Sequence, residues 1–174
     1  MANKLLVVVD MQNDFTFGAL KNDEAIRIIP NVIEKIKAFD GQVVFTRDTH
    51  TEDYMNTQEG RRLPVIHCVK DTDGWELVDG IKELSTDSVI FDKPTFGSTD
   101  LMEAVCDIND NSPLDEVELI GVCTDICVIS NAMLIKAALP ELTVKVDSSC
   151  CAGVTTASHD TALNAMKSCQ IEVY

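Results

Sequence analysis

The chain has 174 residues, 45% of them hydrophobic, and its 14 basic and 29 acidic residues give a formal net charge of −15. A chain of this length and composition can bury a substantial core, so we expect one folded domain over residues 1–174 and exclude a disordered protein. The negative charge disfavours nucleic acid and anionic membranes as partners and favours cations.

Strand-like apolar runs alternate with helix-like runs along almost the whole chain. We predict helices over residues 23–39, 79–84, 99–107, 124–138 and 155–168, and strands over residues 5–9, 42–46, 88–91, 117–121, 142–146 and 171–173. Pro30 is expected to open the main part of its helix, because proline fits the first turn. The strands are continuous apolar runs, which is typical of strands covered on both faces. We therefore predict an α/β fold with a doubly wound, six-stranded, mostly parallel sheet and helices on both faces.

The segment 47–75 does not fit this alternation. It has weak periodicity and is rich in polar, charged and aromatic residues, and a loop of this length in a compact domain is usually functional or disordered. Its histidines favour a functional loop.

The N-terminal residues lack the features of a signal peptide, and no apolar run approaches the about 20 residues of a membrane span. We therefore expect a cytoplasmic protein without a membrane partner. The seven cysteines, an odd number, are expected to be free thiols in a reducing compartment.

Three residues with complementary chemistry end three of the predicted strands: Asp10, Lys93 and, slightly further on, Cys127. Chemistry collects at the carboxyl ends of strands in an open α/β sheet, so a carboxylate, an ammonium and a thiol are expected to converge. Each residue alone has an ordinary explanation as a turn cap, a surface lysine or a buried structural cysteine. We interpret them together as a candidate catalytic site, because each ends a different central strand.

Cys127 is expected in the first turn of the helix that follows its strand, with Thr124 as the N-cap. The helix N-terminus and a nearby lysine both favour an anion, which predicts a thiolate near neutral pH. A metal site formed with Cys123 is the weaker alternative, because no second pair of thiols completes it.

The loop 47–75 contains two of the three histidines. Asp48 and His50 are two residues apart, so their side chains share a face at an extended strand end, and Glu59 and His67 follow. Two imidazoles and two carboxylates suit one divalent ion of Zn, Mn or Fe. A solvated acidic loop with incidental histidines remains an equal alternative. The third histidine, His159, is interpreted as a structural or surface residue.

Four segments resemble the cysteine hydrolases of the isochorismatase-like superfamily and, within it, the nicotinamidases: Leu-Leu-Val-Val-Val-Asp10-Met-Gln-Asn-Asp-Phe15, Thr46-Arg-Asp48-Thr-His50, Asp92-Lys93-Pro-Thr-Phe96 and Gly121-Val-Cys-Thr-Asp-Ile-Cys127-Val. The resemblance covers essentially the whole chain. It implies an isochorismatase-like hydrolase domain over residues 1–174 with a metal-binding loop at about 47–75.

The resemblance also implies roles for individual residues. The catalytic triad would be Asp10, Lys93 and Cys127, and the backbone N–H groups of Cys123 and Cys127 would form the oxyanion hole, with a cis peptide bond before Cys123. The metal ligands would be Asp48, His50 and His67, with Glu59 as the fourth and Asp53 as an alternative to it. The aromatic pocket wall would be Phe15, Trp75 and Phe96.

The function implied is a metal-containing cysteine amidohydrolase that converts nicotinamide to nicotinate and ammonia in NAD salvage. Its partners would be a small amide substrate and further copies of itself in a homo-oligomer. Three alternatives stay open: another cysteine amidase acting on a carbamoyl or ureido compound, a catalytically silent metal-binding protein on this fold, and a thiol redox protein using Cys123 and Cys127 or Cys150 and Cys151.

Overall fold

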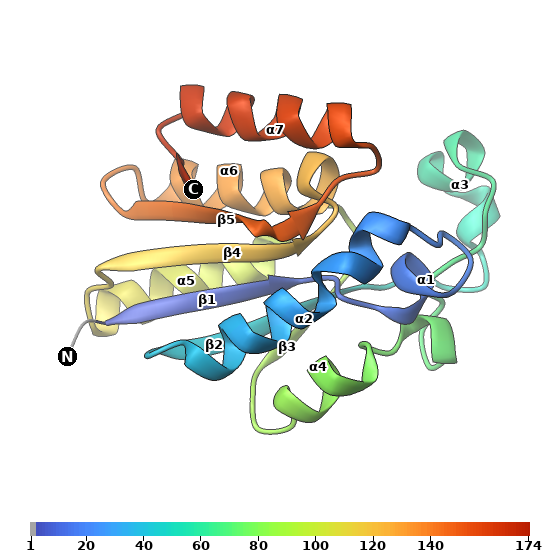
Figure 1. The fold of residues 1–174 in the computed structure, drawn as a ribbon, viewed down its shortest axis with the longest axis horizontal. Helices are drawn as coiled ribbons and strands as arrows, with labels where there is room; N and C mark the ends of the chain where they lie inside the picture. Colours follow the sequence, from blue (N-terminus) through green and yellow to red (C-terminus); the bar gives the residue numbers. More distant parts are fainter. Residues whose placement is uncertain (1–2) are drawn as a thin grey trace.

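The computed structural model, which describes residues 3–174, has one parallel sheet between two layers of helices (Figure 1). The sheet order is β3-β2-β1-β4-β5-β6, and all five pairs of neighbouring strands are parallel. The strands are β1 (Lys4–Val9), β2 (Gln42–Asp48), β3 (Ile90–Lys93), β4 (Glu116–Val122), β5 (Thr143–Ala152) and β6 (Glu172–Val173). The predicted doubly wound fold is confirmed, and its sheet is wholly parallel.

The two helical layers bury opposite sides of the same strands. In β1, for example, Leu5, Val7 and Val9 belong to one apolar cluster, whereas Leu6 and Val8 belong to the other. This burial on both faces is the reason why the strands are continuously apolar. The first cluster packs against α5 (Thr99–Asn111), α6 (Ile129–Ala138) and α7 (Thr156–Ser168), and the second against α2 (Asp23–Ala38) and α4 (Asp79–Leu84).

Helix α2 corrects the expectation for Pro30, which lies in the interior of the helix and not at its start. The helix begins seven residues earlier because the Asn22 side chain accepts hydrogen bonds from the Glu24 and Ala25 N–H groups. Pro30 is on the exposed side, and the buried stripe continues past it. Burial of that stripe outweighs the hydrogen bond that proline removes. The stripe comprises Ala25, Ile28, Val32 and Ile36.

Several strands differ from their predicted bounds, and β2, for example, continues two residues further, to Asp48. The differences at β5 and β3 matter most for the site. Strand β5 continues to Ala152, past the predicted end at Val146, because its polar part still pairs with β4, where Gly121 is opposite Cys151. Strand β3 is an edge strand and ends at Lys93, so Lys93 does not follow a central strand as expected. Strand order depends on contacts between distant segments, which the local apolar pattern does not encode.

The long segment after β2 contains short helical pieces. These are a 3₁₀ turn at Tyr54–Asn56, α3 (Gln58–Arg62) and a second 3₁₀ turn at Asp73–Trp75, while α1 (Asn13–Thr16) follows β1. In Figure 1, α1 and α3 lie beyond the carboxyl ends of β1 and β4, which is the side where ligands bind in open α/β sheets. Within residues 3–174, no helix combines the length and the apolar character needed to cross a membrane.

Candidate active site and metal cluster

Asp10, Lys93 and Cys127 meet at the carboxyl edge of the sheet. The Lys93 Nζ atom lies 2.7 Å from Asp10 Oδ2 and 3.4 Å from Cys127 Sγ. All three side chains are buried, and Asp10 is 0% exposed. Thr46 donates a hydrogen bond of 2.6 Å to the other Asp10 oxygen, Oδ1. One ammonium therefore contacts a carboxylate and a thiol out of water, where solvent screens the charges little.

Gly121 allows the strand that leads to Cys127 to run very close to β1. Its φ is 116°, and a Cβ atom there would lie 2.1 Å from the Val9 carbonyl oxygen, so only glycine fits. The next peptide bond but one, Val122–Cys123, is cis, as the resemblance implied. The chain then enters a π-helical turn at Thr124–Val128 that leads into α6 and carries Cys127. Such turns are frequent at functional sites.

Thr124 is not the N-cap that was expected. It lies inside the π-helical turn, and Cys123 occupies the N-cap position without a side-chain cap. Thr124 is fully buried, with its Oγ1 2.8 Å from Nδ1 of His159 on α7. The hydroxyl is committed to a contact between elements, which the local sequence could not reveal. His159 thus supports the turn that carries Cys127.

The electrostatics of this site correct the expected thiolate. Burial, reinforced by the Asp10 carboxylate, raises the pKa of Cys127 well above its ordinary value, although the Lys93 ammonium opposes this shift. Burial also raises the pKa of Asp10, again against the effect of Lys93. Burial by itself would lower the pKa of Lys93, but the neighbouring Asp10 carboxylate outweighs this effect and raises it, so the ammonium stays charged. The resting cysteine is therefore a thiol that needs a base.

The second group of polar side chains comes from the end of β2 and the loop that follows it. Asp48, His50, Glu59 and His67 each present one possible ligand atom, and these four atoms all lie within 4.8 Å of one another. The His50 Nε2 is 2.9 Å from Asp48 Oδ2 and 3.6 Å from Glu59 Oε1. The His67 Nε2 is 3.5 Å and 3.8 Å from the same two oxygens. The alternative acid, Asp53, lies outside this cluster and instead accepts a hydrogen bond from Asn56.

This cluster fits a divalent metal ion. Tetrahedral ligand atoms with bonds of about 2.1 Å are about 3.4 Å apart, close to most of these separations. Within residues 3–174, Asp48 Oδ1 and His50 Nε2 are buried without a well-aligned hydrogen-bond partner. The His67 Nδ1 lies 2.8 Å from the Val65 carbonyl oxygen, which can only accept a hydrogen bond, and this contact turns Nε2 toward the other cluster atoms.

Asp48 also links the two groups. Its Oδ1 atom is 3.5 Å from Lys93 Nζ, and β2 and β3 pair in a register that puts Asp48 opposite Lys93. Burial favours the neutral acid, but the imidazoles of His50 and His67 and the Lys93 ammonium hold the pKa of Asp48 below its ordinary value. Asp48 therefore remains an anion that can serve a cation on either side.

A cleft of about 1120 Å³ opens over both groups. Its wall includes Cys127 and Cys123 from one side, and Asp48, Glu59 and His67 from the other. Thiol and candidate metal ligands therefore face the same space.

The aromatic residues expected around the cleft divide into two groups. Phe15 and Phe96 line it, and Phe15 packs edge-on against His67. Trp75 does not line the cleft, which corrects its assignment to the pocket wall. Its ring is buried, with the Arg47 guanidinium 3.5 Å from the ring centre and its Nε1–H donating to Thr49. The indole is thus held by a cation–π contact and a hydrogen bond that do not involve the cleft.

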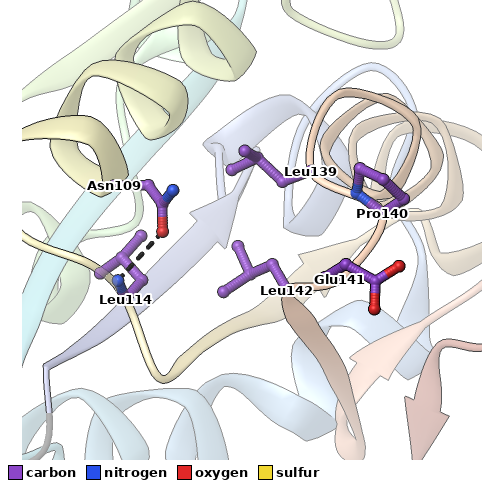
Figure 2. Close-up of a pocket in the computed structure, with 6 residues that line it drawn as sticks. All are labelled: Asn109, Leu114, Leu139, Pro140, Glu141 and Leu142. Carbon is purple, nitrogen blue, oxygen red and sulfur yellow. Dashed lines mark hydrogen bonds between the residues drawn. The ribbon is translucent and has the colours of Figure 1, made fainter.

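A smaller hollow of about 380 Å³ lies near the amino ends of β4 and β5 (Figure 2). It is bordered by the end of α5 and by the segment after α6. At the end of α5, the Leu114 N–H donates to Asn109 Oδ1. No predicted site residue borders it, and its lining offers little chemistry. The lining residues are Asn109, Leu114, Leu139, Pro140, Glu141 and Leu142.

Sequence reasoning missed two buried amides near the site. The Gln12 side chain donates to the Asp48 and Trp75 carbonyls and accepts from the Asp48 N–H, so it joins the end of β1 to that of β2. Asn131 donates to the Cys127 carbonyl over 2.8 Å. The proximity of Gln12 to Asp10 was a usable signal, whereas nothing in the local sequence of α6 distinguishes Asn131.

Comparison with known proteins identifies a family and several relatives. The model of the isochorismatase domain matches residues 4–174. The chain is 30% identical over 177 residues to the nicotinamidase of Saccharomyces cerevisiae, with 75% of this chain and 80% of the yeast protein covered. It is 27% identical over 208 residues to the nicotinamidase of Schizosaccharomyces pombe, which covers 97% of this chain and 91% of that protein.

Solved structures agree with this. The pyrazinamidase of Pyrococcus horikoshii in complex with zinc superposes with a TM-score of 0.82 at 32% identity, covering 99% of this chain and 98% of that chain. A nicotinamidase/pyrazinamidase from Bacillus subtilis gives a TM-score of 0.84 at 25% identity, covering 98% of both chains.

Proposed function

Because the chain belongs to the isochorismatase family and to the nicotinamidases within it, we propose that it is a metal-containing cysteine amidohydrolase that converts nicotinamide to nicotinate and ammonia. The observation that carries this proposal is the shared cleft. The Cys127 thiol with its carboxylate and ammonium faces the same space as Asp48, Glu59 and His67. Such an activity would serve NAD salvage.

In the first half of the reaction, Cys127 Sγ attacks the carboxamide carbon while Asp10 takes the thiol proton. The raised pKa of Asp10 suits this role, because a base is most effective when its pKa approaches the working pH. Moving the proton from sulfur to carboxylate leaves the net charge around Lys93 unchanged, and Lys93 contacts both atoms that exchange the charge. Asp10 then passes this proton to the amide nitrogen, the C–N bond breaks, and ammonia leaves a thioester on Cys127.

In the second half, Asp10 takes a proton from the water that attacks the thioester, and it returns this proton to Cys127 Sγ when the C–S bond breaks, which releases nicotinic acid (nicotinate at neutral pH) and restores the thiol. The backbone N–H groups of Cys123 and Cys127 are proposed to donate to the oxyanion that forms at each addition step. Burial of the site strengthens these contacts, because water does not compete for them.

Asp48, His50, Glu59 and His67 would hold the metal ion, and we propose zinc, with manganese or iron as the alternatives. When bound, the ion would supply a Lewis-acid site for the pyridine nitrogen lone pair and thereby orient the ring. Phe15, which packs on His67, would cover one side of that ring. Metal analysis of the purified protein tests the identity of the ion.

The test of the substrate compares nicotinamide with benzamide, which has the same scissile amide and ring shape but no ring nitrogen. Loss of one anchoring interaction in a buried site costs a few kcal/mol, so we expect kcat/KM for benzamide to be lower by at least about 100-fold. Efficiencies that agree within a few-fold would favour a general cysteine amidase of the same superfamily. A protein that releases no ammonia from any amide in a small panel would be a silent metal-binding protein.

We further propose that the protein acts in the cytoplasm as a homo-oligomer. Size-exclusion chromatography with light scattering tests the assembly, and a mass equal to one chain would reject it.

A further inference from the structure

Asn131 has more contacts around the cleft than its position on a helix would suggest. Its side chain is 1% exposed, and its Nδ2 donates to the Cys127 carbonyl over 2.8 Å and to the Phe96 carbonyl over 3.2 Å. Its Oδ1 accepts from the Ser98 N–H over 2.9 Å. One buried amide therefore uses both donor hydrogens and its acceptor on three backbone groups, and none of these groups belongs to its own helix.

These three bonds join the turn that carries Cys127 to the segment between β3 and α5. Cys127 lies in the turn before α6, whereas Phe96 and Ser98 lie in the segment between β3 and α5. That segment supplies the Thr95 carbonyl, which accepts from Lys93 Nζ over 3.2 Å, and the Phe96 ring that lines the cleft. It is also packed tightly on α6, because a Cβ atom at Gly97 would lie 2.6 Å from Leu134. The turn that carries Cys127 and the segment that carries Phe96 are thus both hydrogen-bonded to the Asn131 side chain.

We infer that Asn131 is a positioning residue that sets both the placement of the Cys127 nucleophile and the position of the Phe96 wall. This inference rests on the proposed amidase function. Only a side chain with two donors and one acceptor satisfies all three backbone groups, and buried backbone groups that lose their partners are costly. A displacement of about 1 Å between a nucleophile and its substrate can cost about 100-fold in rate. Asn131 therefore affects kcat through Cys127 and KM through Phe96.

The main test is Asn131→Asp, which keeps the shape and the acceptor but removes both donors. We expect kcat to fall and KM to rise, with kcat/KM for nicotinamide lower by about 10- to 100-fold. The matched control is Asn111→Asp, because Asn111 donates in the same way to the carbonyl four residues earlier, at Asp107, but lies at the exposed end of α5. Its kinetic constants should stay within twofold of the parent.

Asn131→Thr tests the two hydrogen bonds of Asn131 Nδ2 separately, the one to the Cys127 carbonyl and the one to the Phe96 carbonyl. A threonine hydroxyl in a helix can donate to the carbonyl four residues earlier, here that of Cys127, but it is too short to replace the bond to Phe96. We expect kcat near that of the parent and a raised KM. This variant also keeps the inference testable where Asn131→Asp does not fold.

A double-mutant cycle distinguishes positioning from general destabilisation. Phe96→Ala should raise KM by itself, and Asn131→Asp added to it should raise KM no further, while the loss in kcat remains. The inference would be overturned if the effects of Phe96→Ala and Asn131→Asp on KM add in the double variant. It would also be overturned if kcat and KM of Asn131→Asp lie within twofold of those of Asn111→Asp. A parent protein without nicotinamide turnover would instead reject the proposed function. The rate of Cys127 labelling by iodoacetamide, located by mass spectrometry, would still test Asn131: slower in Asn131→Asp than in Asn111→Asp if the inference holds, equal if it does not.

Discussion

The proposed triad and the cluster of candidate metal ligands are built from different kinds of structure. Asp10 directly follows β1, Lys93 ends β3, and Cys127 lies in the π-helical turn that follows β4, so the sheet positions all three. Of the four cluster residues, in contrast, only Asp48 lies on a strand, at the end of β2, whereas His50, Glu59 and His67 come from the following stretch, which contains only short helical pieces. A site built on a sheet gains its geometry from the core, whereas a site on a loop depends on local hydrogen bonds such as that of His67 with Val65.

This difference predicts that the two halves can be disabled separately. Removing a triad residue should leave the metal in place, and removing a ligand should leave the thiol intact. Asp48 is the exception, because it contacts His50 in the cluster and Lys93 in the triad. The clearest separation is therefore expected from residues that touch one half alone, and the following variants test it.

Cys127→Ala should have the largest effect, because it removes the proposed nucleophile and leaves the cluster untouched. We expect turnover of nicotinamide to fall by at least about 10⁴-fold with an unchanged metal content. Steady-state kinetics and metal analysis measure both. Cys169→Ala is the control, since Cys169 is exposed on the surface. Residual turnover close to that of the control would reject Cys127 as the nucleophile.

Asp10→Asn should be next, because the amide cannot accept the thiol proton. A lost general base typically costs about 10²- to 10⁴-fold in kcat, and we expect a loss in that range. Labelling of Cys127 by iodoacetamide near neutral pH should also become slower. If turnover and labelling both match the parent, Asp10 is a turn residue without a catalytic role.

His67→Ala removes a proposed metal ligand from the other half of the site. We expect loss of the metal and collapse of the about 100-fold preference for nicotinamide over benzamide, while Cys127 labelling stays within a few-fold of the parent. Asp53→Asn is the matched control, because Asp53 is an acid of the same loop outside the cluster. A metal-free His67→Ala protein that keeps the full preference would show that the cluster does not anchor the ring.

The pH dependence should reflect the buried triad. In the proposed reaction Asp10 acts as a carboxylate, and burial raises its pKa. Activity should therefore be lost as the pH falls through a value above about 4, the ordinary pKa of aspartate. The apparent pKa belongs to the coupled pair of Asp10 and Cys127. A profile of kcat/KM against pH measures this limb. A half-point at or below about pH 4 would contradict the role of burial.

Trp75→Phe should have the smallest effect on catalysis, because the ring does not line the cleft. The substitution removes the hydrogen bond to Thr49 and weakens the cation–π contact with Arg47, so we expect a loss of about 1 to 2 kcal/mol in the free energy of unfolding. We expect kcat/KM within about threefold of the parent, whereas Phe15→Leu should raise KM. Urea unfolding and kinetics measure the two quantities. A Trp75→Phe protein with a KM as high as that of Phe15→Leu would return Trp75 to the pocket.

Sequence alone determined the features that depend on local pattern. Continuous apolar runs predicted the strands and their double coverage, because burial on both faces demands it. The ends of three such runs identified Asp10, Lys93 and Cys127 as one group, and the loop with two histidines identified the four residues that the structure brings within 4.8 Å. The carboxyl ends of parallel strands all lie at one edge of the sheet, so the proximity of residues at these ends could be predicted.

Only the tertiary structure decided the features that arise from contacts between distant segments. Strand order placed Lys93 on an edge strand beside Asp48, and burial made Cys127 a thiol where the helix and lysine alone predicted a thiolate. Packing also holds the Trp75 ring against Arg47, away from the cleft, and places the Asn131 side chain against the Cys127 carbonyl. A pKa depends on how far packing excludes water, and a hydrogen bond between distant residues depends on which groups packing brings together. The order of residues along the chain states neither of these directly.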